Sequence, residues 1–251
     1  MPATARRNLN LSTDTGFLKL IAIITMVIDH AGKMFFPQYP FLRIIGRIAF
    51  PIFCYCLTVG SLYTRSMPKY ILRVFILALI SQPIYVLSLD HVSGLMSALP
   101  FDTQPLQSAI MWYLYSLRSA NILFTLTLGL MMIWSIQEKR FIATAVLTWA
   151  VWYFDGYINY GWQGIALILL FYAFCDRPLS SFVWVFGFML WWGMGGSYRI
   201  FGIGFSSQAF AVLALPLIYL RTDTRIKINK HFFYLFYPLH LAIIYLIDKF
   251  V

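Results

Sequence analysis

The sequence predicts an all-α integral membrane protein, a bundle of about nine transmembrane helices whose N-terminus is cytoplasmic. Hydrophobic residues make up 61% of the 251 positions and charged residues only 11%, too few to cover the surface of a soluble domain. Apolar stretches long enough to cross a bilayer recur from residue 17 to the end. Basic residues cluster in short segments between these stretches, which is typical of loops that set membrane topology.

Nine apolar segments follow one another, and each is expected to form a helix. They cover residues 17–36, 41–63, 70–88, 119–137, 141–154, 161–175, 181–196, 204–220 and 232–250. The fifth to seventh are short, which leaves the count open by one or two. The connection 89–118 contains two prolines and an aromatic stretch, and we expect it to be interfacial or re-entrant. Residues 1–16 are polar and show no cleavable signal peptide, so the sequence predicts a cytoplasmic N-terminal segment followed by a single domain, 17–251.

The distribution of charge supports this topology. With the N-terminus inside, 13 of the 19 Lys and Arg residues fall on the inner side of the membrane. The net charge of +10 therefore indicates topology rather than nucleic-acid binding. Cys54, Cys56 and Cys175 all lie in apolar segments, which favours buried thiols over a metal site or a disulfide.

The first two apolar segments carry charges at similar depth. Asp29 and His30 interrupt the first, and His30 lies about 16 Å beyond Lys19 at the helical rise of about 1.5 Å per residue. Arg43 and Arg47 are four residues apart, so they share a helix face. Unpaired charges in lipid cost several kcal/mol, so Asp29 is expected to pair with Arg43 or Arg47. Neighbouring helical residues point about 100° apart, which directs His30 towards a cavity rather than towards Asp29.

A second polar position lies in the last apolar segment, within "FYPLHL". Pro238 cannot donate a hydrogen bond to the carbonyl of Tyr234, so a bend is expected just before His240. A bend, an open carbonyl and an imidazole about 15 Å beyond Lys230 predict a polar pocket near the middle of the membrane.

Further polar residues are candidates for lining a substrate pocket. Asp155 and Tyr160 follow the fifth segment on its outer side, while Asn121 and Gln208 lie inside or near apolar segments. Each candidate has a structural alternative. Asp29 and the arginines can be a helix-packing clamp, and His30 a hydrogen-bonded core residue. His240 can fill a kink, and Asn121 and Gln208 can join helices by hydrogen bonds.

Motifs for zinc hydrolysis, dithiol chemistry, phosphate binding and serine catalysis are missing from the sequence: it contains no HExxH, no CxxC, no P-loop and no nucleophile elbow. The catalytic arrangement that remains is a histidine acting as a general base beside arginines that hold an anion.

Several blocks, in order, carry a family resemblance. With "FLKLIAIITMVIDHAGKMFFP", "LRIIGRIAFPIF", "SANILFTLTLGL", "YGWQGIALILL" and "FYPLHL", the sequence resembles the TraX family of bacterial membrane proteins over nearly its whole length. The namesake of that family is implicated in N-acetylating the pilin subunit of conjugative pili, and the family is grouped with membrane acyltransferases. A looser similarity is to acyltransferase-3 enzymes, in which a basic residue precedes the catalytic histidine by eleven positions, as Lys19 precedes His30.

The resemblance implies an acetyltransferase of the bacterial cytoplasmic (inner) membrane that uses acetyl-CoA as donor and needs no metal. His30 would act as general base, with Asp29, Arg43 and Arg47 beside it and His240 as a second acid/base. Inner basic residues, with Lys19 and Arg73 as candidates, would hold the CoA phosphates. The acceptor, an amine or a hydroxyl on a protein, glycan or small molecule, stays open. Two alternatives remain: a small proton-coupled transporter, and a non-enzymatic membrane assembly factor.

Overall fold

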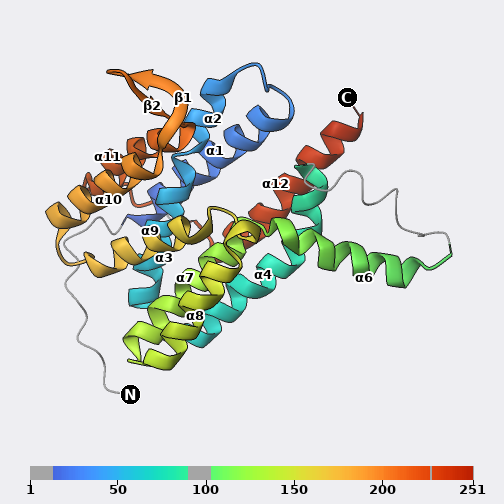
Figure 1. Ribbon diagram of the computed structural model, residues 1–251, viewed down its shortest axis with the longest axis horizontal. Helices are drawn as coiled ribbons and strands as arrows, with labels where there is room; N and C mark the ends of the chain where they lie inside the picture. The colour runs from blue at the N-terminus through green and yellow to red at the C-terminus, as the bar shows by residue number, and fades with distance from the viewer. Residues whose placement is uncertain (1–13, 90–102, 227, 251) are drawn as a thin grey trace. The chain divides into compact units, whose positions relative to one another are not determined.

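The computed structural model describes residues 14–89, 103–226 and 228–250, and these are mostly helical (Figure 1). The chain divides into two compact units. Unit 1 comprises Met1–Met67 and Ala166–Asn229, and unit 2 comprises Pro68–Ile165 and Lys230–Val251. Each unit is described by itself. The predicted single domain over residues 17–251 stays a prediction.

Unit 1 is built from helices that surround α3, with one β-hairpin. Its elements are α1 (Thr15–Met34), α2 (Pro40–Gly46), α3 (Ala49–Tyr63), most of α9 (Gly161–Ala173), α10 (Pro178–Trp192), β1 (Met194–Ile200), β2 (Ile203–Phe205), η3 (Ser207–Leu213) and α11 (Ala214–Tyr219). Helix α1 packs against α2 and α3, and η3 packs against α10 and α2. Tyr55 and Phe171 meet edge to face in the core, with ring centroids 5.6 Å apart.

Helix α1 begins at a side-chain cap and buries one stripe. The carboxylate of Asp14 accepts a hydrogen bond from the backbone N–H of Phe17 at 3.3 Å, which satisfies one of the free donors at the start of the helix. Leu18, Ala22 and Met26 follow at intervals of four residues and are all buried. The burial of this stripe fixes the rotation of α1 about its axis, and with it the direction in which the charged residues near the end of the helix point.

The predicted span 41–63 is a pair of helices separated by a turn. Helix α2 ends at Gly46, the turn holds Arg47 and Ile48, and α3 begins at Ala49. The backbone N–H of Arg47 is shared between the carbonyls of Arg43 (3.1 Å) and Ile44 (3.2 Å), so the chain tightens there. The whole stretch Pro40–Tyr63 is long and apolar enough to cross a bilayer.

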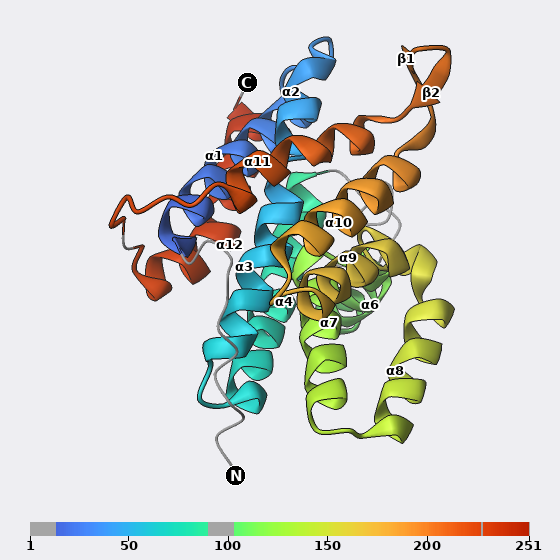
Figure 2. The same cartoon turned by 90° about the vertical axis from the view of Figure 1, so that its left-hand side faces the viewer.

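Unit 2 contains two long helices and several shorter ones. Its elements are α4 (Met67–Ser88), α6 (Pro105–Ser116), η1 (Leu117–Ser119), α7 (Ile122–Gln137), α8 (Phe141–Tyr153), η2 (Asp155–Tyr157) and α12 (Lys230–Phe250). Helix α7 packs antiparallel to α8 across a tight turn in which Lys139 adopts a φ of 54° (Figure 2). Helix α12 runs without interruption through Pro238.

Four helical segments in the described ranges are long and apolar enough to span a membrane: Thr15–Met34, Pro40–Tyr63, Met67–Ser88 and Phe232–Phe250. Five shorter apolar helical segments accompany them: Ile122–Gln137, Phe141–Tyr153, Gly161–Ala173, Pro178–Trp192 and Ser207–Tyr219. The helical membrane character is thus confirmed, whereas the number of nine spans stays a prediction. Of the connection 89–118, residues 105–116 form α6, and residues 90–102 lie outside the described part.

A β-hairpin replaces the end of the seventh predicted helix, 181–196, and the start of the eighth, 204–220. Helix α10 stops at Trp192, and the chain enters β1 at Met194. Gly195 has a φ of 87°, which a right-handed helix cannot contain. The predicted helices were too long because the prediction relied on apolar composition, which does not distinguish a helix from a strand.

Candidate functional site

The predicted ion pair is present between α1 and α2. The Nη1 atom of Arg43 lies 2.8 Å from Oδ2 of Asp29 and also donates to the backbone carbonyl of Asp29 at 3.3 Å. The side chain of Arg43 is 29% exposed and that of Asp29 is 15% exposed, so most of the surface of both side chains is buried within the protein. Both residues thus satisfy the rule that charges inside apolar structure occur in pairs. This confirms the expected pairing and identifies Arg43 as the partner.

Two glycines allow α1 and α2 to approach closely at this point. A β-carbon at Gly46 would overlap the β-carbon and Oδ1 of Asp29, and one at Gly32 would lie 2.6 Å from the β-carbon of Leu42. Oδ1 of Asp29 is buried and has no hydrogen-bond partner among the described residues. The carboxylate is therefore clamped between a guanidinium on one side and the backbone of α2 on the other.

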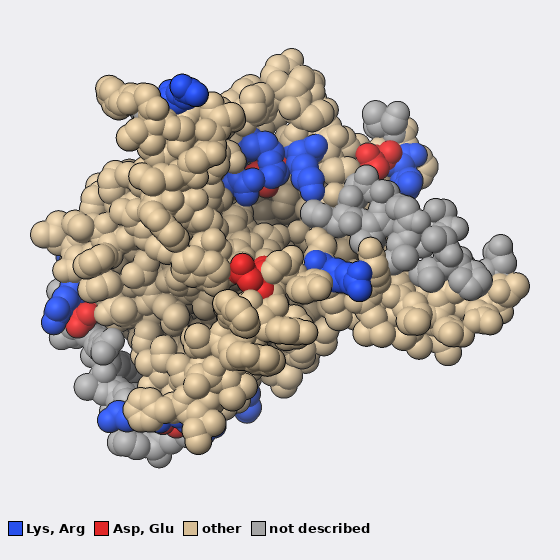
Figure 3. Space-filling view, viewed as in Figure 1, with Lys and Arg blue, Asp and Glu red and all other residues tan. Residues whose placement is uncertain are grey.

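Further positive charge surrounds this carboxylate. Arg47 and Lys33 are close enough to Asp29 to interact electrostatically with it, and Lys33 is four residues beyond Asp29 on the same face of α1. Figure 3 shows basic side chains gathered around an acidic one at the α1–α2 end of unit 1. Three cations around one carboxylate leave a net positive site, and we name this set of four residues the α1–α2 charge cluster.

His30 is partly buried in the last two turns of α1, directly after Asp29. An imidazole at this position has a cationic cluster as its immediate neighbour. Such a combination can accept a proton while negative charge is stabilised nearby.

His240 lies in unit 2, on α12, and is 5% exposed. Its Nδ1 lies 3.0 Å from the backbone carbonyl of Phe236, one turn earlier. The imidazole stacks on the ring of Phe236 and meets the ring of Tyr237 edge to face, with centroids 5.2 and 5.6 Å away. These contacts fix the orientation of the ring.

Asn121 belongs to a buried hydrogen-bond network in unit 2. Its side chain caps α7 by accepting from the N–H of Leu123 at 3.0 Å, and its amide donates to the carbonyl of Ala78 and to Oε1 of Gln82, both at 2.9 Å. The amide of Gln82 in turn donates to the carbonyls of Ser116 (2.7 Å) and Ser119 (3.0 Å). The polar atoms of Asn121 therefore join α4 to α7, and its predicted place in a substrate pocket stays a prediction.

Asp155 and Tyr160 form the entry to α9. Oδ1 of Asp155 accepts from the backbone N–H of Trp162 at 2.6 Å and lies close against Gly161. Tyr160 and Gly161 have φ values of 64° and 54°. A bulky residue rarely adopts this left-handed conformation, so Tyr160 is held there by its surroundings.

The three remaining predicted site residues, Gln208, Lys19 and Arg73, lie on three different helices. Gln208 lies in η3, and its Nε2 atom is buried with no hydrogen-bond partner in the described ranges. Lys19 is partly buried in the second turn of α1. Arg73 is exposed on α4, where its Nε donates to the carbonyl of Lys69 at 3.1 Å and its guanidinium lies over the ring of Tyr70.

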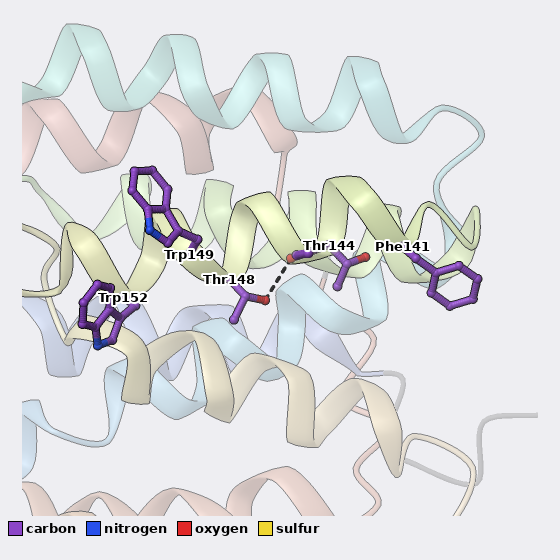
Figure 4. A pocket seen from close by; sticks show the side chains of 6 residues that line it. Phe141, Thr144, Thr148, Trp149 and Trp152 are labelled. Carbon is purple, nitrogen blue, oxygen red and sulfur yellow. Dashed lines mark hydrogen bonds between the residues drawn. The ribbon is translucent and has the colours of Figure 1, made fainter.

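An open groove on α8 contains none of the predicted site residues. Phe141, Thr144, Ala145, Thr148, Trp149 and Trp152 line it, all from one helix (Figure 4). The hydroxyl of Thr148 is used by its own helix, since it donates to the carbonyl of Thr144 at 2.9 Å. Trp149 and Trp152 are 59% and 74% exposed, as expected for a helix face that lies against lipid.

Sequence reasoning missed the residues that support the charges. Gly46 stands between the two arginines in "RIIGR", and its role depends on Asp29, seventeen residues earlier. The only local signal was a small residue inside a bulky apolar run. Gln82 gave a clearer signal, because an amide next to Pro83 in an apolar helix needs partners.

Comparison with known proteins places these features in a family. The family model described as "TraX protein" matches residues 14–248. The chain is 26% identical over 248 residues to "Probable fimbrial assembly protein FimC, serogroup H1" of Dichelobacter nodosus, an alignment that covers 90% of this chain and 92% of that protein. It is 53% identical over 38 residues to "Uncharacterized protein RP591" of Rickettsia prowazekii (strain Madrid E), 15% of each chain. No solved structure matches. With the family model covering nearly its whole length, the chain belongs to the TraX family.

Proposed function

We propose that this membrane protein transfers an acetyl group from acetyl-CoA to an amine or hydroxyl acceptor. The observation that carries the proposal is the position of His30 directly after Asp29, whose carboxylate is surrounded by Arg43, Arg47 and Lys33. A base next to stabilised positive charge is the arrangement that acyl transfer requires. The relative named as a fimbrial assembly protein supports an acceptor in the cell envelope, such as a pilus subunit.

The reaction assigns one task to each group. His30 takes the proton of the acceptor N–H or O–H while the acceptor lone pair attacks the thioester carbonyl. Arg47 and Arg43 stabilise the negative charge that develops on the carbonyl oxygen, or hold an anionic group of the acceptor. Asp29 fixes Arg43 in place. The carbon–sulfur bond then breaks, and the CoA thiolate leaves and takes up the proton that His30 accepted.

The donor enters from the cytosol, where CoA is found, so we place the protein in the bacterial cytoplasmic membrane. Lys19 lies in the second turn of α1, towards the expected cytoplasmic side, and Arg73 lies in the second turn of α4. Both are positioned within their own helices to meet phosphate groups at the membrane surface. The acceptor approaches from the opposite side.

The test is release of free CoA thiol from acetyl-CoA by purified protein in detergent. Wild type is compared with His30→Ala and with the matched control Thr148→Ala on the exposed face of α8, all at equal amounts of monodisperse protein. We expect slow hydrolysis by wild type and the control, and its loss in His30→Ala. His240→Ala, measured in parallel, tests whether this second histidine also contributes to thiol release as an acid/base.

A second candidate function rests on the same contacts. The Asp29–Arg43 pair and Gly46 clamp α1 to α2, and a clamp suffices for a non-enzymatic factor in fimbrial assembly, as the name of the Dichelobacter relative indicates for that protein. No thiol release, no binding of acetyl-CoA and normal function of a folded His30→Ala variant would together favour this candidate over the enzyme.

A further inference from the structure

The β1–β2 hairpin projects an apolar tip from unit 1. Its strands pair antiparallel, with Arg199 opposite Gly204 and Ile200 opposite Ile203. The two residues between the strands are Phe201 and Gly202. Phe201 is 101% exposed and Ile203 is 50% exposed, so the tip of the hairpin presents two apolar side chains outside the fold.

The turn at this tip uses an unexpected residue. Phe201 and Gly202 have φ values of 51° and 80°, the positive values that a two-residue hairpin of type I′ requires at both central positions. Asn, Asp and Gly are favoured at the first of these positions, and a bulky aromatic residue is disfavoured. In water this turn would be better served by a small polar residue, so the phenyl ring indicates a contact outside the chain.

The base of the hairpin is held firmly. A β-carbon at Gly196 would overlap the backbone of Phe205 and Ser206, and one at Gly193 would overlap Ala209 of η3. The N–H of Ser206 donates to the carbonyl of Gly193 at 2.7 Å. The base of the hairpin is therefore anchored to the rest of unit 1 by close backbone packing.

A second aromatic segment lies at the same end of unit 1. Figure 2 shows the hairpin and the α1–α2 connection at that end. In this connection Phe36, Tyr39 and Phe41 are 46%, 49% and 53% exposed, and their rings contact one another in sequence. Helix α10 also ends there, with Trp191 52% exposed. Aromatic residues gathered at the ends of membrane helices mark the level of the lipid headgroups.

We propose that the tip of the hairpin inserts into the headgroup region of the bilayer that holds the protein. Phe201 and Ile203 enter the boundary between headgroups and acyl chains, and the exposed Arg199 beside them contacts lipid phosphate. The hairpin thereby fixes the depth of unit 1, including the α1–α2 charge cluster, relative to the membrane surface. This inference does not depend on the acetyltransferase activity.

The experiment places a probe at the tip. Cys54, Cys56 and Cys175 are buried, so a Phe201→Cys variant offers one accessible thiol for a polarity-sensitive maleimide fluorophore. The labelled protein is reconstituted into vesicles of phosphatidylethanolamine and phosphatidylglycerol. Glu138→Cys, in the exposed turn after α7, provides the matched water-facing control, and Val146→Cys on the exposed face of α8 provides the lipid-facing one.

We expect a shift of the emission at position 201 to shorter wavelength, quenching by lipids that carry a nitroxide near the headgroup, and protection from aqueous iodide. The same probe at Ile203→Cys should behave alike. Emission and iodide quenching equal to those at Glu138→Cys, without lipid quenching, would overturn the proposal and leave a protein partner as the occupant.

Discussion

Gly46 lies directly against the carboxylate of Asp29, so closely that α2 has no room for a side chain at this position. The contact brings the backbone of α2 onto the charged end of α1 and buries Oδ1 of Asp29. The ion pair with Arg43 and the missing β-carbon of Gly46 are therefore parts of one packing arrangement.

Gly46→Ala should destabilise the protein by about 1–3 kcal/mol, the usual cost of forcing extra carbon into a packed interior. The added β-carbon meets the β-carbon of Asp29, which cannot move without moving α1. Thermal unfolding in detergent measures the effect. Gly187→Ala on α10 is the control, since a β-carbon there meets nothing within 4 Å. Equal melting temperatures for the two variants would contradict the packing argument.

Breaking the ion pair should show energetic coupling. Asp29→Asn and Arg43→Gln should each cost about 1.5–3 kcal/mol, because each breaks the ion pair and deprives a partly buried charge of its closest partner. The double variant should cost less than the sum of the two, which a double-mutant cycle on unfolding free energies detects. Arg65→Gln, at an exposed position after α3, controls for loss of positive charge. Strict additivity would mean that the pair contributes nothing.

Asp14 should give the protein a pH-dependent stability. Its carboxylate accepts hydrogen bonds from Phe17 at the start of α1 and from the backbone and hydroxyl of Thr224, the latter two at 2.9 and 2.8 Å. Burial acts to raise the pKa of Asp14, but these hydrogen bonds outweigh it and lower the pKa below its ordinary value of 3.8. The carboxylate thus stabilises the fold above the unfolded pKa, and the benefit is lost as pH falls through the folded pKa.

Asp14→Ala should therefore lose about 1 kcal/mol at pH 7, the usual worth of a helix cap. The gap between the variant and wild type should narrow as the pH falls below about 4. The free energy of unfolding of both proteins, measured from pH 7 to below pH 4, checks this prediction, and Asp176→Ala at an exposed position is the control. A gap that stays constant with pH would rule out the carboxylate as its source.

Pro83 and Tyr113 should be coupled. Pro83 lies inside α4 and cannot donate to the carbonyl of Leu79, and the hydroxyl of Tyr113 on α6 donates to that carbonyl instead, at 2.9 Å. Tyr113→Phe should cost about 1–3 kcal/mol, because it leaves the carbonyl without a donor. In a Pro83→Ala background the helix supplies its own N–H, and the cost of Tyr113→Phe should fall. An unchanged cost would show that the hydroxyl serves another purpose.

The parts of the structure that follow from local chemistry were predictable. The apolar runs predicted the helical segments, and the high energy of an unpaired charge in lipid predicted that Asp29 would meet an arginine. Contacts that depend on distant parts of the chain were not predictable in this way. Asn121 and Gln82 are thirty-nine residues apart, and nothing in either segment specifies the other.

The hairpin was missed for a different reason. The run "FMLWWGMGG" and the apolar stretch after it satisfy the composition of a membrane helix. Whether they form helix or strand is decided by close backbone contacts at Gly193 and Gly196. Hydropathy cannot detect such contacts, because it scores the polarity of each side chain and does not show where a missing β-carbon lets two backbone segments approach.

The Asp29–Arg43 pair also has a consequence for synthesis of the chain. Asp29 leaves the ribosome fourteen residues before Arg43, and an aspartate within a membrane helix opposes insertion by up to about 3 kcal/mol. The ion pair with Arg43 offsets this cost, so insertion of the first helix should become more favourable once the second is present, and we expect the two to enter the bilayer as a helical hairpin.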